Sequence, residues 1–119
     1  MTAALVLLNP FAGGGRALRL EPDIRTRLRT DHPGVRLVVT ESIDSAHALI
    51  GDTEPGSRIV LVGGDGTVNR MLPALVGTER ELGIVPLGSG NDVARALGVY
   101  AMTWQQALAH ALTAPSSRM

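Results

Sequence analysis

Three glycine-rich stretches contain the side chains of this chain that could take part in chemistry. They are NPFAGGG at 9–15, GGDGT at 63–67 and GSGND at 88–92. Glycine lets the backbone approach a ligand closely with its N–H groups directed outward, and the N-terminus of a helix that follows such a turn attracts an anion. Asp65 stands between two glycines directly after an apolar run, where a carboxylate is costly to bury without a partner. Together the stretches indicate a site for a phosphate-bearing ligand.

Each stretch also has a purely structural interpretation. GGG is common as a flexible connection, and GSGND is common as a turn that an asparagine caps. Asp65 would then serve only to cap the helix that follows it. The interpretation as a binding site therefore depends on whether the fold brings the three stretches together.

The segments between these stretches predict the elements that must position them. Apolar runs predict strands, and segments with apolar residues three or four apart predict helices. The strands are predicted over 3–8, 35–40, 58–62 and 83–87, and the helices over 16–30, 44–50, 67–76, 92–97 and 103–113. We expect Pro22 to reset the start of the first helix, Pro73 to bend the third, and Pro86 to mark an edge or an early strand end. We interpret the last residues, TAPSSRM, as a frayed tail.

The alternation of strands and helices predicts an α/β fold with three layers, α/β/α, around a mainly parallel sheet. In such a sheet every loop that leads from a strand into a helix lies at the same edge. The loops at 9–15, 40–44, 63–67 and 88–92 are therefore expected to meet there, and ligands of open parallel sheets bind at this edge.

Composition excludes several classes of function. The 119 residues suit one domain, and the absence of cysteine excludes disulfides, zinc–thiolate sites and a cysteine nucleophile. All 11 basic residues are arginine, so the lysine that a Walker-type P-loop needs is missing. A net charge of zero and few aromatic residues give no indication of nucleic-acid binding. No signal peptide or membrane-spanning segment is evident, and we expect a cytoplasmic protein.

NPFAGGG, GGDGTVN (63–69) and PLGSGNDVAR (86–95) resemble the ATP-binding domain of the diacylglycerol kinase family, which includes bacterial lipid kinases and the sphingosine and ceramide kinases. GGDGT alone is shared with NAD kinases and phosphofructokinases, whereas PLGSGNDVAR points to the lipid kinases. The order and spacing fit over residues 3–113. The resemblance implies the N-terminal fold common to NAD kinases and diacylglycerol kinases, with ATP and Mg²⁺ as cofactors.

The resemblance also implies which residues form the ATP site. Asp65 is expected on the side of Mg²⁺ and the phosphates, and Ser89 is expected to add a hydroxyl near the phosphates. The predicted nucleotide-binding residues are Asn9, Pro10, Gly13, Thr40, Gly63, Gly64, Asp65, Gly66, Thr67, Asn69 and Ser89. We assign no catalytic residue within the chain, since the family's general base lies in a second domain.

Two departures from the family pattern are visible. Arg70 follows GGDGTVN, where family members often have glutamate, and residues 1–119 form a single nucleotide-binding domain without the β-rich second domain that holds the lipid. We expect the isolated chain to be inactive and consider a homodimer and attachment at the membrane surface. The alternatives are a small-molecule kinase of the NAD kinase or phosphofructokinase type and a non-catalytic nucleotide-binding module.

Overall fold

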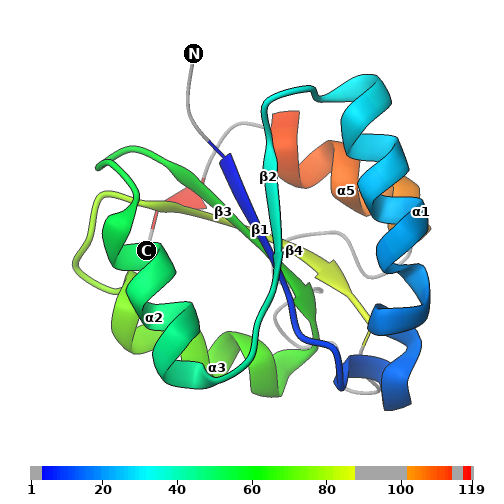
Figure 1. Ribbon diagram of the computed structural model, residues 1–119. Helices are drawn as coiled ribbons and strands as arrows, with labels where there is room; N and C mark the ends of the chain where they lie inside the picture. The colour runs from blue at the N-terminus through cyan, green and yellow to red at the C-terminus, as the bar shows by residue number, and fades with distance from the viewer. Residues whose placement is uncertain (1–3, 88–101, 114–116, 119) are drawn as a thin grey trace.

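Strands and helices alternate along the chain in the computed structural model, which describes residues 4–87, 102–113 and 117–118 (Figure 1). The elements are β1 (Ala4–Leu8), a 3₁₀ turn η1 (Ala12–Gly15), α1 (Arg16–Asp31), β2 (Arg36–Val39), α2 (Ile43–Asp52), β3 (Arg58–Gly63), α3 (Asp65–Leu75), β4 (Glu81–Pro86), α5 (Trp104–Thr113) and β5 (Ser117–Arg118). None of the described helices is long and apolar enough to cross a membrane.

The strands form one sheet in the order β2-β1-β3-β4-β5. The first four are parallel, and β5 pairs antiparallel with only the beginning of β4. The four parallel strands are almost continuously apolar because helices cover both faces of the sheet. The prediction of an α/β fold with a mainly parallel sheet is therefore confirmed.

Successive strand residues point to opposite faces of the sheet and so divide the core into two layers. Val6, Val60 and Val85 belong to the layer covered by α1 and α5. Leu7 and Leu61 belong to the layer covered by α2 and α3. Figure 1 shows these two helix pairs on either side of the sheet, which confirms the predicted α/β/α arrangement.

The three prolines within predicted elements have different outcomes. The expectation that Pro22 resets the start of α1 is wrong, because the helix runs unbroken from Arg16 to Asp31. Pro22 lies on the exposed side of the helix, where water can bind the Leu18 carbonyl that lacks its helical partner. Pro86 is the last residue of β4, as predicted, and Pro73 lies inside α3.

Two segments that were predicted to be irregular have regular structure. Residues 12–15 form a short 3₁₀ turn in place of a flexible loop, and it is kinked at Gly13 and Gly14, whose φ angles of 63° and 65° are left-handed. Within the predicted frayed tail, Ser117 and Arg118 pair with β4 as β5. The helix predicted over 92–97 lies outside the described residues.

Polar contacts hold the end of the sheet where the parallel strands begin. Arg58 of β3 and Glu81 of β4 are register partners and form an ion pair of 3.2 Å, with only 14% of each side chain exposed. The Arg58 guanidinium also donates to the Ala111 carbonyl near the end of α5 (3.0 Å). Nearby, Arg80 Nε donates to Thr53 Oγ1 at the end of α2 (2.6 Å). These contacts stabilise the end of the molecule opposite the predicted site.

Close packing of α5 on β4 predicts the effect of enlarging Gly83. A Cβ atom at Gly83 would lie 2.7 Å from the Cβ of Ala111, whereas nothing lies within 4 Å of a Cβ at Gly51. Gly83→Ala should lower the free energy of unfolding by about 2 kcal/mol through overpacking. Gly51→Ala, in α2, should raise it by up to about 1 kcal/mol. Urea unfolding followed by circular dichroism measures both, and equal effects of the two variants would contradict the packing argument.

Candidate functional site

The site is expected where the direction of the chain along the sheet reverses. After β1 the chain moves outward to β2, and it then returns to β3 on the other side of β1. The loops after β1 and β3 therefore lead to helices on opposite faces of the sheet and leave a crevice between them. In doubly wound α/β folds, ligands bind at such a switch point, outside the carboxyl ends of the strands.

Asn9 links the elements that meet at this crevice. Its Nδ2 donates to Thr67 Oγ1 in α3 (3.0 Å), and its Oδ1 accepts from the Phe11 backbone N–H (3.1 Å). Its own backbone N–H donates to the Val62 carbonyl of β3 (3.2 Å). One asparagine thus ties the loop after β1 both to the end of β3 and to the first turn of α3.

Two of the predicted glycines allow the loops to approach one another. A Cβ at Gly63 would lie 2.5 Å from Thr67 Oγ1, and a Cβ at Gly13 would lie 2.6 Å from the Leu87 carbonyl oxygen. The Gly63 carbonyl also accepts from the Leu87 N–H (2.8 Å). The glycines at these two positions are therefore required by contacts within the protein, and Gly63 lets α3 turn back over β3.

The loop after β2 forms the other wall of the crevice. The backbone N–H and the hydroxyl of Thr40 both donate to the Leu8 carbonyl, at 3.0 and 3.3 Å. Ser42 caps α2, since its hydroxyl accepts from the Ser45 N–H (3.0 Å) while the Ser45 hydroxyl accepts from the Ser42 N–H (3.1 Å). This reciprocal cap fixes the start of α2 directly beside the crevice.

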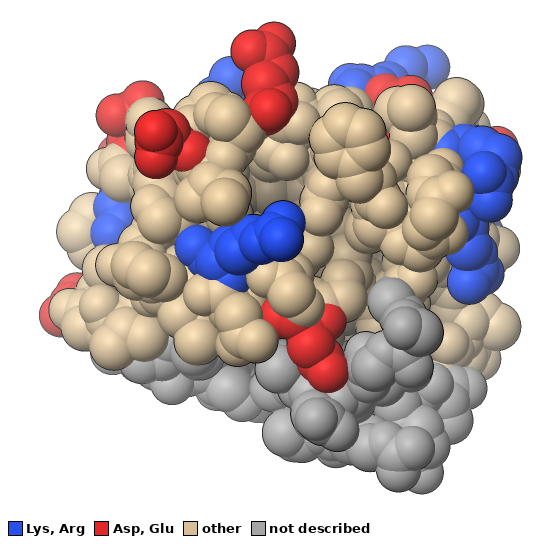
Figure 2. Space-filling model, turned by 90° about the horizontal axis from the view of Figure 1, so that it is seen from below, with Lys and Arg blue, Asp and Glu red and all other residues tan. Residues whose placement is uncertain are grey.

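A cavity of about 300 Å³ opens between these walls, which is at the small end of the range for ligand pockets. Figure 2 views the molecule from this end and shows a hollow bordered by acidic and basic side chains. The floor is apolar and the rim is mixed. The lining residues are Leu7, Asn9, Pro10, Phe11, Thr40, Glu41, Ser42, Ile43, Leu61, Thr67, Arg70 and Met71.

The structure brings four of the predicted nucleotide-binding residues to this cavity. Asn9, Pro10, Thr40 and Thr67 come from three different loops or helix starts and line it together. The remaining described residues of the set lie outside the cavity lining: Gly13, Gly63, Gly64, Asp65, Gly66 and Asn69. Most of these belong to the turn between β3 and α3, next to Thr67, so they border the site. Ser89 lies outside the described residues.

Several cavity residues were not identified from the sequence. Phe11, Ile43 and Met71 supply apolar surface, and Glu41 supplies a carboxylate at the rim. Met71 had a detectable signal, because it follows Thr67 by four residues and so shares its helix face. The others depend on how the loops after β1 and β2 are folded.

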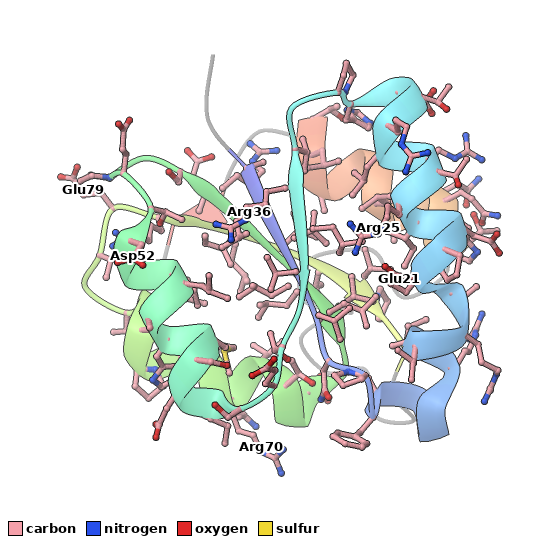
Figure 3. All side chains as sticks on the ribbon, in the orientation of Figure 1. Glu21, Arg25, Arg36, Asp52, Arg70 and Glu79 are labelled. Atoms are coloured by element: carbon pink, nitrogen blue, oxygen red, sulfur yellow. The ribbon has the colours of Figure 1, made fainter. Side chains whose placement is uncertain are left out.

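Few charged groups of the described residues lie around the site. Asp65 is the first residue of α3, where the helix dipole favours a negative charge. Among the described residues no three acidic or histidine side chains gather into a metal site. Arg70 is exposed and forms no ion pair with any described residue, and Figure 3 shows it projecting from α3 at the edge of the molecule. The His47 ring contacts the Arg70 carbonyl through Nε2 at 2.7 Å.

Comparison with known proteins identifies the family. Residues 3–119 match the model of the diacylglycerol kinase catalytic domain. The chain belongs to this family. It is 39% identical over 97 residues to the diacylglycerol kinase of Mycobacterium tuberculosis, an alignment covering 78% of this chain and 31% of that protein. It is 32% identical over 107 residues to sphingosine kinase 1 of Rattus norvegicus, covering 82% and 28%.

Solved structures support the same relationship. A crystal structure of a diacylglycerol kinase from Bacillus anthracis superimposes with a TM-score of 0.70 at 25% identity, and the match covers 92% of this chain and 42% of that one. The alignments with the Mycobacterium tuberculosis and Rattus norvegicus proteins cover 31% and 28% of those proteins, so this member of the family spans about a third of the length of these curated relatives. Family membership separates the chain from the NAD kinase and phosphofructokinase alternative.

The packing at the turn between β3 and α3 predicts opposite outcomes for two glycines of GGDGT. Gly63→Ala would place a methyl group against Thr67, while nothing lies within 4 Å of a Cβ at Gly66, an exposed position in the first turn of α3. Gly63→Ala should cost about 2 kcal/mol or more of unfolding free energy. Gly66→Ala should be neutral or stabilising by up to about 1 kcal/mol. Urea midpoints test this, and a stable Gly63→Ala protein would contradict the proposed close contact.

Proposed function

We propose that the chain is the ATP-binding domain of a lipid kinase, which transfers the γ-phosphoryl group of ATP to a lipid hydroxyl. The observation that carries the proposal is the cavity at the switch point between β1 and β3, lined by Asn9, Thr40 and Thr67 beside a glycine-rich helix start. Family membership supports it.

The two parts of the site suit the two parts of a nucleotide. The apolar floor of the cavity suits a base, since it offers little to satisfy a charged group. The phosphates are proposed to lie along the turn at Gly63–Gly66, where α3 begins, because the N-terminus of a helix attracts an anion. Gly66 is exposed there, with open space around it. Thr67 lies between the two parts, since it lines the cavity and belongs to the first turn of α3.

Asp65 is the residue proposed to face Mg²⁺. Mg²⁺ in nucleotide sites is commonly held by one or two carboxylates, by the substrate phosphates and by water. A single carboxylate at the start of α3 fits this pattern better than a site made of protein ligands alone. When bound, the ion would offset the charge of the phosphates during transfer.

The acceptor and its general base are assigned to a second domain. The named relatives are a diacylglycerol kinase and a sphingosine kinase, which are about three times longer than the matched segment, so a lipid acceptor and a second domain are inferred from them. This chain would hold and orient the nucleotide. Because a lipid acceptor resides in a membrane, we expect the whole protein to act in the cytoplasm at a membrane surface.

The role of Asp65 can be tested by measuring how Asp65→Asn changes ATP affinity with and without Mg²⁺. Asp65→Asn should weaken ATP binding in the presence of Mg²⁺ about tenfold, equal to ~1.4 kcal/mol, because a charged metal contact is lost. Without Mg²⁺ the same variant should bind ATP as well as or better than the unmodified chain, since a negative charge near the phosphates is removed.

Isothermal titration calorimetry measures both affinities, and Asp52→Asn is the matched control. Asp52 is the exposed last residue of α2 and lies far from Arg70 in Figure 3. A uniform loss of affinity in both conditions would contradict a role toward the metal. An absence of any ATP binding by the folded chain would contradict the proposed function itself.

The assignment of ATP binding to this chain and of lipid binding to a second domain gives a further prediction. The 119-residue chain should bind Mg–ATP and transfer no phosphoryl group to diacylglycerol in mixed micelles, because the lipid site is assigned to the proposed second domain. A longer protein that includes the proposed second domain should do so. A radiolabelled-ATP assay distinguishes the two, and measurable transfer by the short chain would contradict the assignment of the acceptor site to a second domain.

A further inference from the structure

We propose that Phe11 and Arg70 are base-stacking residues that hold the purine ring of the nucleotide at the mouth of the cavity. The proposal rests on the function proposed above and assigns roles to two residues that it leaves unexplained. Phe11 comes from the loop after β1 and Arg70 from the middle of α3, and both line the cavity. Each has a flat terminal group that can lie against an aromatic ring.

The exposure of the Phe11 side chain favours a ligand that covers it. Its side chain is 83% exposed, although burying a phenylalanine in a core is favourable. The backbone at Phe11 is held beside the cavity, because the Phe11 N–H donates to Asn9 Oδ1 and Asn9 is itself bonded to Thr67. The aromatic ring lines the cavity, where a flat apolar ligand would cover it.

The cavity beneath Phe11 is suited to a base and unsuited to phosphate. Leu7, Leu61 and Met71 form its floor and are at most 6% exposed. Ile43, at the start of α2, adds a further apolar group that is 44% exposed. A phosphate placed against these side chains would lose its hydration without gaining a partner, whereas a purine ring would bury apolar area.

The position of Arg70 in α3 is closer to the proposed site of the base than to that of the phosphates. Thr67, Arg70 and Met71 are three or four residues apart and share one helix face. Arg70 lies about 7.5 Å along the helix axis from Asp65, at 1.5 Å per residue, and so beyond the first turn where the phosphates are proposed to lie. The contact between His47 Nε2 and the Arg70 carbonyl ties this part of α3 to α2. The arginine that replaces the expected glutamate would thus stack on the base without contacting the metal.

Two simple ligands allow binding of the base and binding of the phosphates to be measured separately. Adenosine carries the base alone, and inorganic tripolyphosphate carries the phosphates alone. Phe11→Ala and Arg70→Gln should each weaken the binding of adenosine and of Mg–ATP about five- to tenfold, in line with the usual strength of stacking on a base. Both should leave tripolyphosphate binding unchanged. NMR titration of the labelled chain measures these weak affinities.

Matched controls guard against general effects. Leu18→Ala removes an exposed apolar side chain, and Arg29→Gln removes an exposed arginine, both on α1 and neither in the cavity lining. Neither should change any affinity. Phe11→Trp should retain adenosine binding, and the fluorescence added by the new tryptophan should be quenched by adenosine. Because Phe11 is exposed, its variants are expected to fold, and circular dichroism tests this.

The possible outcomes separate the inference from the proposed function. If Arg70→Gln weakens tripolyphosphate but not adenosine, Arg70 is a phosphate ligand and the inference is wrong for it. If Phe11→Ala leaves adenosine affinity unchanged while Mg–ATP still binds, the stacking role is wrong and the proposed function stands. If the unmodified chain binds none of the three ligands, both fail.

Discussion

The hydrogen bond between the Asn9 amide and the Thr67 hydroxyl connects the two loops that diverge at the switch point of the sheet, and the arrangement of the site depends on it. The chain leaves β1 for one face of the sheet and β3 for the other, so the loops after these strands separate where a ligand is expected. The asparagine amide can hold both sides because it has a donor and an acceptor. It uses the acceptor for the loop that carries Phe11.

The molecule separates the groups that stabilise it from the groups that are available to a ligand. At the beginning of the parallel strands, Arg58 and Glu81 are paired and largely buried, and Arg80 binds the end of α2. At the other end, Arg70 and Phe11 are exposed at the cavity. Exposed polar and aromatic groups contribute little to folding, so this end can carry a binding function without loss of stability.

Much of the fold could be predicted because its signals are local. Runs such as AALVLL and RIVLV are apolar throughout, which is typical of strands covered on both faces. The parallel arrangement then places the loops after these strands at one edge, so Asn9, Thr40 and Thr67 were expected to meet. The error at Pro22 arose because a missing helical hydrogen bond costs less where water can replace it, and exposure cannot be read from a local pattern.

By itself the sequence determined the element types, the α/β class, the family resemblance and the loops in which a phosphate-bearing ligand is expected, because apolar periodicity and glycine placement are properties of short segments. Only the tertiary structure decided which side chains share the cavity. Phe11, Ile43 and Met71 enter it because of loop conformation and helix phase, and Gly13 and Gly63 are needed for contacts with residues elsewhere in the chain. These relations join distant segments, and they exist only once the sheet has brought those segments together.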